Sequence, residues 1–185
     1  MRIVAGTAGG RVIQSPPGTH ARPTADRVRE AIFSMISPYL PDSRVLDLFS
    51  GSGAMALEAI SRGAGQAVMA DCHPQSLATM RANVSKLGFA EQCRIESGDF
   101  RQVLSRLARE GAVFDLVFLD PPYAQGFYLP ALDQLLQGNL LSQRCWVVAE
   151  HPAQASVGAQ GYAVDRVRRY GQTAVTLLKK EPNAI

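Results

Sequence analysis

The chain has 185 residues, 46% of them hydrophobic, and a formal net charge of +3. This length fits one domain of ordinary size, and the apolar content excludes a disordered chain. The longest apolar runs are too short to cross a bilayer and the N-terminus lacks the features of a signal peptide, so we expect a cytoplasmic protein with no membrane partner.

The N-terminal segment is predicted to form an arm. Two short β-rich runs surround a Gly-rich turn within residues 1–18, a pattern typical of a β-hairpin. A helix is predicted from Ala25 to Leu40, where apolar residues recur at helical spacing, with Thr24 in the N-cap position. We therefore expect a hairpin arm over residues 1–24 and one larger domain over residues 25–185.

Strand and helix patterns alternate from Arg44 onward. Five apolar, strand-like runs are separated by four segments with helical spacing, which predicts a mostly parallel, doubly wound α/β sheet with helices on both faces. The last two runs, residues 162–170 and 173–180, alternate in polarity around a tight turn. They predict an antiparallel hairpin at the edge of the sheet.

The first strand–helix turn, "VLDLFSGSGAM", is rich in glycine and contains an acid. Asp47, Ser50, Gly51 and Gly53 stand where ligands bind in open α/β sheets, outside the carboxyl ends of the strands. The turn is not the dinucleotide fingerprint GxGxxG, because Ala56 occupies the third glycine position. It is not a P-loop either, since no Lys-Ser or Lys-Thr follows.

Acids also end the next two strands. Asp71 can accept hydrogen bonds from ribose hydroxyls, and Asp99 with Phe100 can contact the edge and face of an adenine. Asp47 lies in an apolar strand, where a lone carboxylate is costly without a partner. Three acids at one sheet edge fit a nucleoside that has a cationic centre and no phosphate. S-adenosylmethionine is such a molecule.

The fourth strand ends in Asp120-Pro121-Pro122-Tyr123. A carboxylate and a rigid backbone carbonyl can accept hydrogen bonds from an exocyclic NH₂ group and aim its lone pair at a methyl donor. The Tyr123 ring offers a face on which a base can stack, worth ~1–3 kcal/mol. This chemistry suits the amine of either an adenine or a guanine.

Several stretches resemble one known family. "RIVAG…GR", "RPTADRVREAIF", "DLFSGSG", "LEAISRGA" and "LDPPY" together span nearly the whole chain. On these motifs the sequence is similar to the class I S-adenosylmethionine-dependent methyltransferases with an Asn/Asp-Pro-Pro-Tyr/Phe motif. More narrowly, it resembles the RsmD family of bacterial 16S rRNA guanine-N2 methyltransferases. The segment "RPTADRVREAIF" is the most specific of these motifs.

The resemblance implies methyl transfer from S-adenosylmethionine to N2 of one guanine in 16S rRNA, within the small ribosomal subunit or its assembly intermediate, by a monomer that needs no metal. It implies a cofactor site made of Asp47, Ser50, Gly51, Gly53, Asp71, Asp99 and Phe100. It implies catalysis by Asp120, Pro121, Pro122 and Tyr123, and RNA contacts from Arg11, Arg22, Thr24, Arg29 and Tyr123. Asp71 departs from the family pattern, which more usually has Glu there.

The charge distribution agrees with an RNA substrate. Residues 1–30 contain five arginines against two acids, and a second basic cluster lies between Arg166 and Lys180, whereas the middle of the chain is close to neutral. Two basic ends around a neutral centre would suit a polyanion.

The cysteines and histidines indicate no metal. Cys72, Cys93 and Cys145 are widely spaced and form no CxxC pair, and the three histidines are isolated. This pattern gives neither a disulfide framework nor a zinc site, so we expect buried, reduced thiols.

Three other functions stay open at this point. An N6-adenine DNA or RNA methyltransferase, or a protein-glutamine methyltransferase, would use the same Asp-Pro-Pro-Tyr clamp. A non-catalytic RNA-binding module could also keep this fold. Intact acids at Asp47, Asp71 and Asp120 argue against the last alternative.

Overall fold

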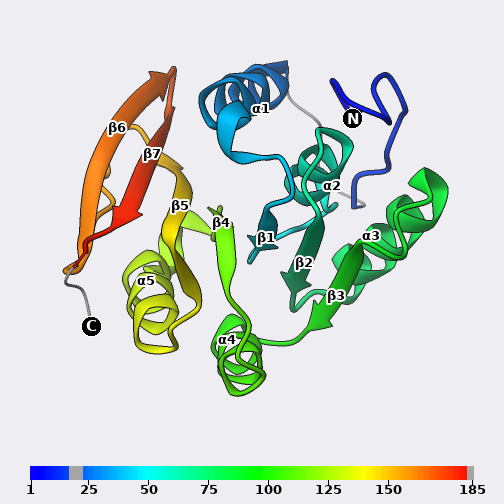
Figure 1. The fold of residues 1–185 in the computed structure, drawn as a ribbon. Coiled ribbons are helices and arrows are strands. Elements are labelled where there is room, and N and C mark those ends of the chain that lie inside the picture. Colours follow the sequence, from blue (N-terminus) through cyan, green and yellow to red (C-terminus); the bar gives the residue numbers. More distant parts are fainter. Residues whose placement is uncertain (17–22, 183–185) are drawn as a thin grey trace.

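A seven-stranded sheet forms the centre of the computed structural model, which describes residues 1–16 and 23–182. The strands are β1 (Arg44–Asp47), β2 (Gln66–Asp71), β3 (Cys93–Ser97), β4 (Phe114–Leu119), β5 (Leu141–Pro152), β6 (Tyr162–Tyr170) and β7 (Thr173–Lys180). Their order across the sheet is β3-β2-β1-β4-β5-β7-β6 (Figure 1). Strands β1 to β5 are parallel, and β7 is antiparallel to both β5 and β6. The predicted α/β fold with a C-terminal edge hairpin is confirmed.

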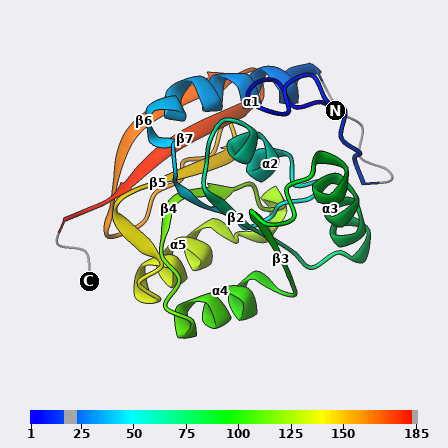
Figure 2. The same ribbon diagram turned by 45° about the vertical axis from the view of Figure 1, so that its right-hand side comes forward.

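Helices cover both faces of the sheet (Figure 2). The helices are α1 (Pro23–Ile36), α2 (Ala54–Ser61), α3 (Pro74–Leu87), α4 (Phe100–Arg109) and α5 (Tyr128–Gln137), with short 3-10 turns at Ser37–Tyr39 and Tyr123–Gln125. One apolar core lies between the sheet and α1, α2 and α3, and the other lies under α4 and α5. No helix in the described part of the chain is both long and apolar enough to span a membrane.

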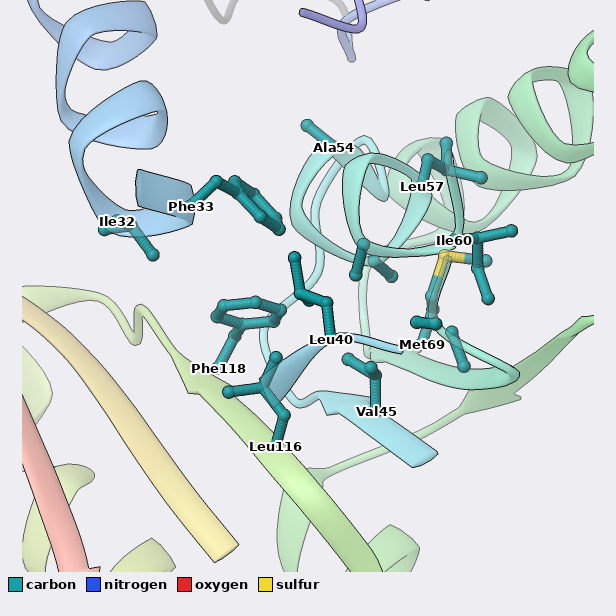
Figure 3. Close-up of a cluster of buried hydrophobic side chains, with 14 of the residues drawn as sticks. Ile32, Phe33, Leu40, Val45, Ala54, Leu57, Ile60, Met69, Leu116 and Phe118 are labelled. Atoms are coloured by element: carbon teal, nitrogen blue, oxygen red, sulfur yellow. The ribbon is translucent and has the colours of Figure 1, made fainter. Parts of the chain in front are cut away.

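The first core brings α1 and α2 onto the centre of the sheet (Figure 3). Ile32 and Phe33 of α1 and Leu57 of α2 are fully or almost fully buried in it. The Phe33 ring packs against Phe118 of β4 with 5.8 Å between the ring centroids. This packing fixes α1 beside the carboxyl end of β4, where the Asp-Pro-Pro-Tyr segment begins.

The bounds of α1 differ from the predicted helix. It begins at Pro23, so Thr24 lies inside its first turn and is not the N-cap that we expected. Proline suits the first helical position because its missing N–H would have no partner there. The helix ends at Ile36 instead of Leu40 and continues as a 3-10 turn that contains Pro38. Proline removes a helical hydrogen-bond donor and disfavours helical backbone at the residue before it.

The N-terminal hairpin is held by buried polar groups of α2. Its strands pair at a single bridge, between Arg2 and Val12. The backbone N–H groups of Val4 and Ala5 donate to the Glu58 carboxylate over 2.7 and 3.1 Å. Glu58 is fully buried and also accepts from Arg62 Nε at 2.6 Å. One carboxylate therefore satisfies three donors and sets the position of the hairpin.

A buried amide connects the end of the hairpin to the first strand–helix loop. The Asn83 side chain of α3 accepts from Gln14 N at 2.8 Å and donates to Gln14 O at 3.0 Å. The same amide donates to Ser52 O at 2.9 Å. Asn83 is fully buried, so these bonds have no competition from water. The hairpin and the glycine-rich loop are thus positioned by the same side chain.

Replacing Glu58 with alanine should lower the free energy of unfolding by about 2–4 kcal/mol, because it leaves two backbone donors and a guanidinium without their acceptor. Urea unfolding measures this loss. Glu30→Ala, at an exposed position on α1, is the matched control and should change the free energy by less than about 0.5 kcal/mol. Equal effects of the two substitutions would contradict this role of Glu58.

Candidate functional site

Two cavities open at the carboxyl ends of the parallel strands. The first has a volume of about 500 Å³ and the second about 600 Å³. Both are lined by Phe49 and Asp120, so they meet at the end of β4. This is the edge at which open α/β sheets bind ligands.

The first cavity contains the acids that end β2 and precede α4. Asp71 accepts from Gly51 N at 3.0 Å and from His73 N at 2.8 Å, which fixes the carboxylate at the cavity wall. Asp99 is the N-cap of α4 and accepts from Arg101 N at 2.9 Å. Carboxylate oxygens retain further lone pairs, so both groups can still accept bonds from a ligand.

Phe100 lines this cavity but is largely covered. It is 4% exposed, and its ring packs 5.3 Å from Phe49 and 5.2 Å from Phe127, centroid to centroid. The Arg101 guanidinium lies 4.4 Å from the Phe100 centroid. Phe100 is therefore part of an aromatic cluster in the cavity wall, and it leaves little open ring surface for a planar ligand.

The second cavity contains the acid at the end of β1. Asp47 is buried and accepts from Ser50 Oγ at 2.7 Å and from Ala56 N at 3.3 Å. Burial raises the pKa of Asp47 to about 6, against the lowering effect of these two hydrogen bonds. Within the described residues, this carboxylate forms no ion pair with a cationic side chain.

The glycine-rich loop enters α2 at Gly53, whose φ of +82° favours glycine. An added Cβ there would approach the Met69 sulfur to 3.0 Å.

Asp120 lies where the two cavities join, beside a second carboxyl group. The β4–β5 register pairs Leu119 with Ala149, so Asp120 and Glu150 follow on adjacent strands. Asp120 is exposed to solvent at the open cavity, although the protein around its carboxyl group still excludes much of the bulk water. This desolvation, with the charges of Glu150 and Asp47, raises the pKa of Asp120 above its ordinary value. Burial likewise raises the pKa of Glu150.

The rest of the Asp-Pro-Pro-Tyr segment frames the first cavity. Pro121 is buried, whereas Pro122 is exposed. Tyr123 begins a 3-10 turn and is 46% exposed, so part of its ring is available to a ligand. Burial, then the charges of Asp120 and Glu150, raise the pKa of Tyr123 to about 12. All four residues of the segment line the cavity, as a clamp at the end of β4 requires.

The residues predicted to contact RNA are placed differently from one another. Arg11 donates from Nη1 to Leu87 O at 3.0 Å and from Nη2 to Lys86 O, at the end of α3. Arg22 and the side chain of Thr24 lie outside the described residues. Arg29 is 5% exposed and lines the second cavity instead of an open surface.

Of the three cysteines predicted to be buried, only Cys145 is fully so. Cys93 is half-buried, and Cys72, which follows Asp71 at the end of β2, is exposed and lines the first cavity. The end of a parallel strand opens toward the ligand side, which explains why Cys72 lies outside the core. Within residues 1–16 and 23–182, no group of three or more His, Cys, Asp or Glu side chains could hold a metal ion.

The family described as Conserved hypothetical protein 95 matches residues 1–179. The chain belongs to this family. It is the RsmD family that the sequence motifs resemble. The Ribosomal RNA small subunit methyltransferase D of Escherichia coli (strain K12) is 30% identical over 98% of this chain and 90% of its own. YlbH of Bacillus subtilis (strain 168) is 32% identical over 97% of this chain and 99% of its own. The solved structure of yhhF from Escherichia coli matches with a TM-score of 0.85, 30% identity and 98% coverage of both chains.

The sequence missed one residue of this RsmD-family site and assigned another a different place. Glu150 lies two residues before the end of β5, beside Asp120 after β4, and an acid directly after the apolar run "CWVVA" was an available signal. Arg29 was predicted to face RNA from the family resemblance, and the pattern of its helix gives no sign of burial in a cavity wall. Its position depends on how α1 packs on the sheet, which only the tertiary structure provides.

Replacing Asp47 with asparagine should stabilise the RsmD-family protein without ligand. The folded state holds the Asp47 proton more tightly than the unfolded state, so wild-type stability falls as pH rises from about 4 through 6. Asp47→Asn should therefore be more stable by about 1–3 kcal/mol at pH 7.5, and the difference should vanish toward pH 4. Urea unfolding at several pH values measures it, with exposed Asp133→Asn as the control. A variant less stable than wild type at pH 7.5 would contradict this account.

Proposed function

We propose that the protein transfers a methyl group from S-adenosylmethionine to the exocyclic N2 amine of a guanine in 16S rRNA. The observation that carries this proposal is the position of Asp120. It ends β4 in an Asp-Pro-Pro-Tyr segment and lies at the junction of the two cavities. Methyl transfer requires that the donor and the target amine touch, and ligands in two cavities can touch only where the cavities join. The choice of guanine and of 16S rRNA rests on family membership.

The charges of the site support a nucleoside cofactor without phosphate. Asp71 and Asp99 line the first cavity, and Asp47 and Glu150 line the second. Four carboxyl groups would repel a pyrophosphate, but they suit ribose hydroxyls, an adenine amine and a cationic centre. S-adenosylmethionine supplies an electrophilic methyl group on a sulfonium. Asp71 would hold its ribose, Asp99 and the edge of Phe100 its adenine, and the loop from Ser50 to Gly53 its amino-acid end.

Asp120 would act on the target amine. Its carboxylate and the Pro121 carbonyl accept hydrogen bonds from the two N–H groups, which frees the nitrogen lone pair for in-line attack on the methyl carbon. The carbon–sulfur bond breaks as the nitrogen–carbon bond forms, and the amine then gives up one proton. Asp120 can accept it because its carboxyl group already has a raised pKa. Tyr123 supplies the exposed ring on which the base stacks.

The edge strand β6 supports an RNA substrate. Arg166, Arg168 and Arg169 are exposed, and among the described residues none of the three is paired with a carboxylate. Strand β6 runs in the same direction as β5, because β7 is antiparallel to both. Its end therefore approaches the sheet edge that contains the cavities. Exposed guanidinium groups on both faces of this edge strand, without carboxylate partners among the described residues, fit the phosphates of RNA.

The proposal is tested by transfer of labelled methyl groups to small ribosomal subunits from cells that lack this protein, followed by nucleoside mass spectrometry. We expect N2-methylguanosine. The negative controls are the protein incubated without subunits and subunits that are already methylated. N6-methyladenosine would keep the clamp chemistry and overturn the choice of base. Label in protein, with none in RNA, would favour glutamine methylation instead.

Asp120→Ala should reduce the single-turnover rate of transfer at least 100-fold, because the amine loses its acceptor. Binding of S-adenosylhomocysteine, measured by calorimetry, should stay within about threefold of wild type. Asp133→Ala, an exposed change on the neighbouring helix α5, should leave both measurements unchanged. A parallel loss of binding and transfer in Asp120→Ala would contradict a role confined to the target amine.

A further inference from the structure

Arg29 is a buried guanidinium with unused donors. Its Nη2 donates to Arg2 O at 2.7 Å and lies 3.2 Å from Asp26 Oδ1. Its Nε is buried and has no hydrogen-bond partner in the part of the chain that the structure describes. A guanidinium presents five N–H donors in a planar fork, and leaving such donors dry and unpaired is costly. The residue is 95% buried, so its position calls for an anionic partner that the chain itself does not fully supply.

The cavity beside Arg29 is lined by side chains of both charges. Among the described residues that line it, Arg29 is the only Lys or Arg, whereas Asp47, Asp120 and Glu150 line it as acids. Burial raises the pKa of Asp47 and of Glu150, and the causes of these shifts include no lowering by Arg29. A ligand with both an ammonium and a carboxylate would satisfy the two sides together. An α-amino-acid group has this chemistry.

The cavities also fit the two ends of one ligand. The nucleoside end would occupy the first cavity, beside Asp71 and Asp99, and the chain would pass the junction at Phe49 and Asp120 into the second. We propose that Arg29 binds the α-carboxylate of the cofactor's amino-acid group through guanidinium donors that its contacts with Arg2 and Asp26 leave unused. This inference rests on the proposed function and revises the sequence-based prediction that Arg29 contacts RNA.

The same guanidinium would connect the ligand to the N-terminal hairpin. Arg29 Nη2 holds the carbonyl of Arg2, the residue that forms the hairpin bridge with Val12. Met1 of the hairpin also lines the second cavity. A carboxylate on Arg29 would therefore add a contact to a side chain that already positions the hairpin, so ligand binding should order both.

The test compares three adenosine ligands by calorimetry: S-adenosylhomocysteine, its analogue 5′-deoxy-5′-(3-aminopropylthio)adenosine, which lacks only the carboxylate, and methylthioadenosine, which lacks the whole amino-acid group. Wild type should bind S-adenosylhomocysteine about 10- to 100-fold more tightly than the aminopropyl analogue, as expected for charge-assisted hydrogen bonds. Arg29→Met should abolish this preference and keep its affinity for methylthioadenosine within threefold of wild type. Arg29→Lys, which keeps the charge without the fork, should retain part of the preference.

The controls separate this inference from the proposed function. Arg27→Met, at an exposed position on the same helix, should keep the full preference for S-adenosylhomocysteine. Wild type that binds none of the three ligands would overturn the cofactor proposal itself. Wild type that binds normally, with an Arg29→Met variant that still prefers the carboxylate, would overturn only the role of Arg29. Equal loss of all three ligands in Arg29→Met would also overturn it, since Arg29 would then support the cavity as a whole.

Discussion

The sheet register forces several carboxyl groups into one small space, and much of the structure follows from this constraint. Parallel strands point to the same edge, so Asp47 at the end of β1, Asp120 directly after β4 and Glu150 near the end of β5 become neighbours. The protein around these acids raises their pKa values, although Asp120 is exposed at the cavity. Packing under α1 and α2 must offset their repulsion. A cationic ligand would relieve it, so the same acids that cost stability would give the site its affinity.

The N-terminal hairpin depends on a second buried carboxylate, of the opposite kind. Glu58 is as buried as Asp47, but it accepts from two backbone N–H groups and one guanidinium. Glu58 therefore holds the N-terminal hairpin in place, and its hydrogen-bonding capacity is already used within the protein. Asn83 extends this arrangement to Ser52, so the hairpin and the glycine-rich loop share a fixed support. Hydrogen-bond partners, more than burial, separate Glu58, which supports the structure, from Asp47, for which we propose a role in the site.

Patterns along the chain predicted the order and type of the strands and helices, because polarity with a period of 2 or 3.6 residues is a local property. The same patterns locate the ends of the strands, so they also predicted that Asp47, Asp71, Asp99 and Asp120 lie at one edge of the sheet. They did not predict the fully paired state of Glu58 or the burial of Arg29. Both depend on contacts between elements far apart in sequence, as the separation of 54 positions from Val4 to Glu58 illustrates.

The separation of charges by depth restricts what can reach Asp120. Carboxyl groups line the second cavity, whereas Arg166, Arg168 and Arg169 lie on the exposed edge strand β6. RNA phosphates would be attracted to the arginines and repelled by the carboxyl groups. An RNA backbone would therefore stay outside the cavities, while an uncharged base, turned out of its stack, could enter. Arg29 is the exception, a cation among acids at depth. Its burial in the cavity wall would keep it from phosphates at the edge of the sheet, in line with the small carboxylate that we propose for it.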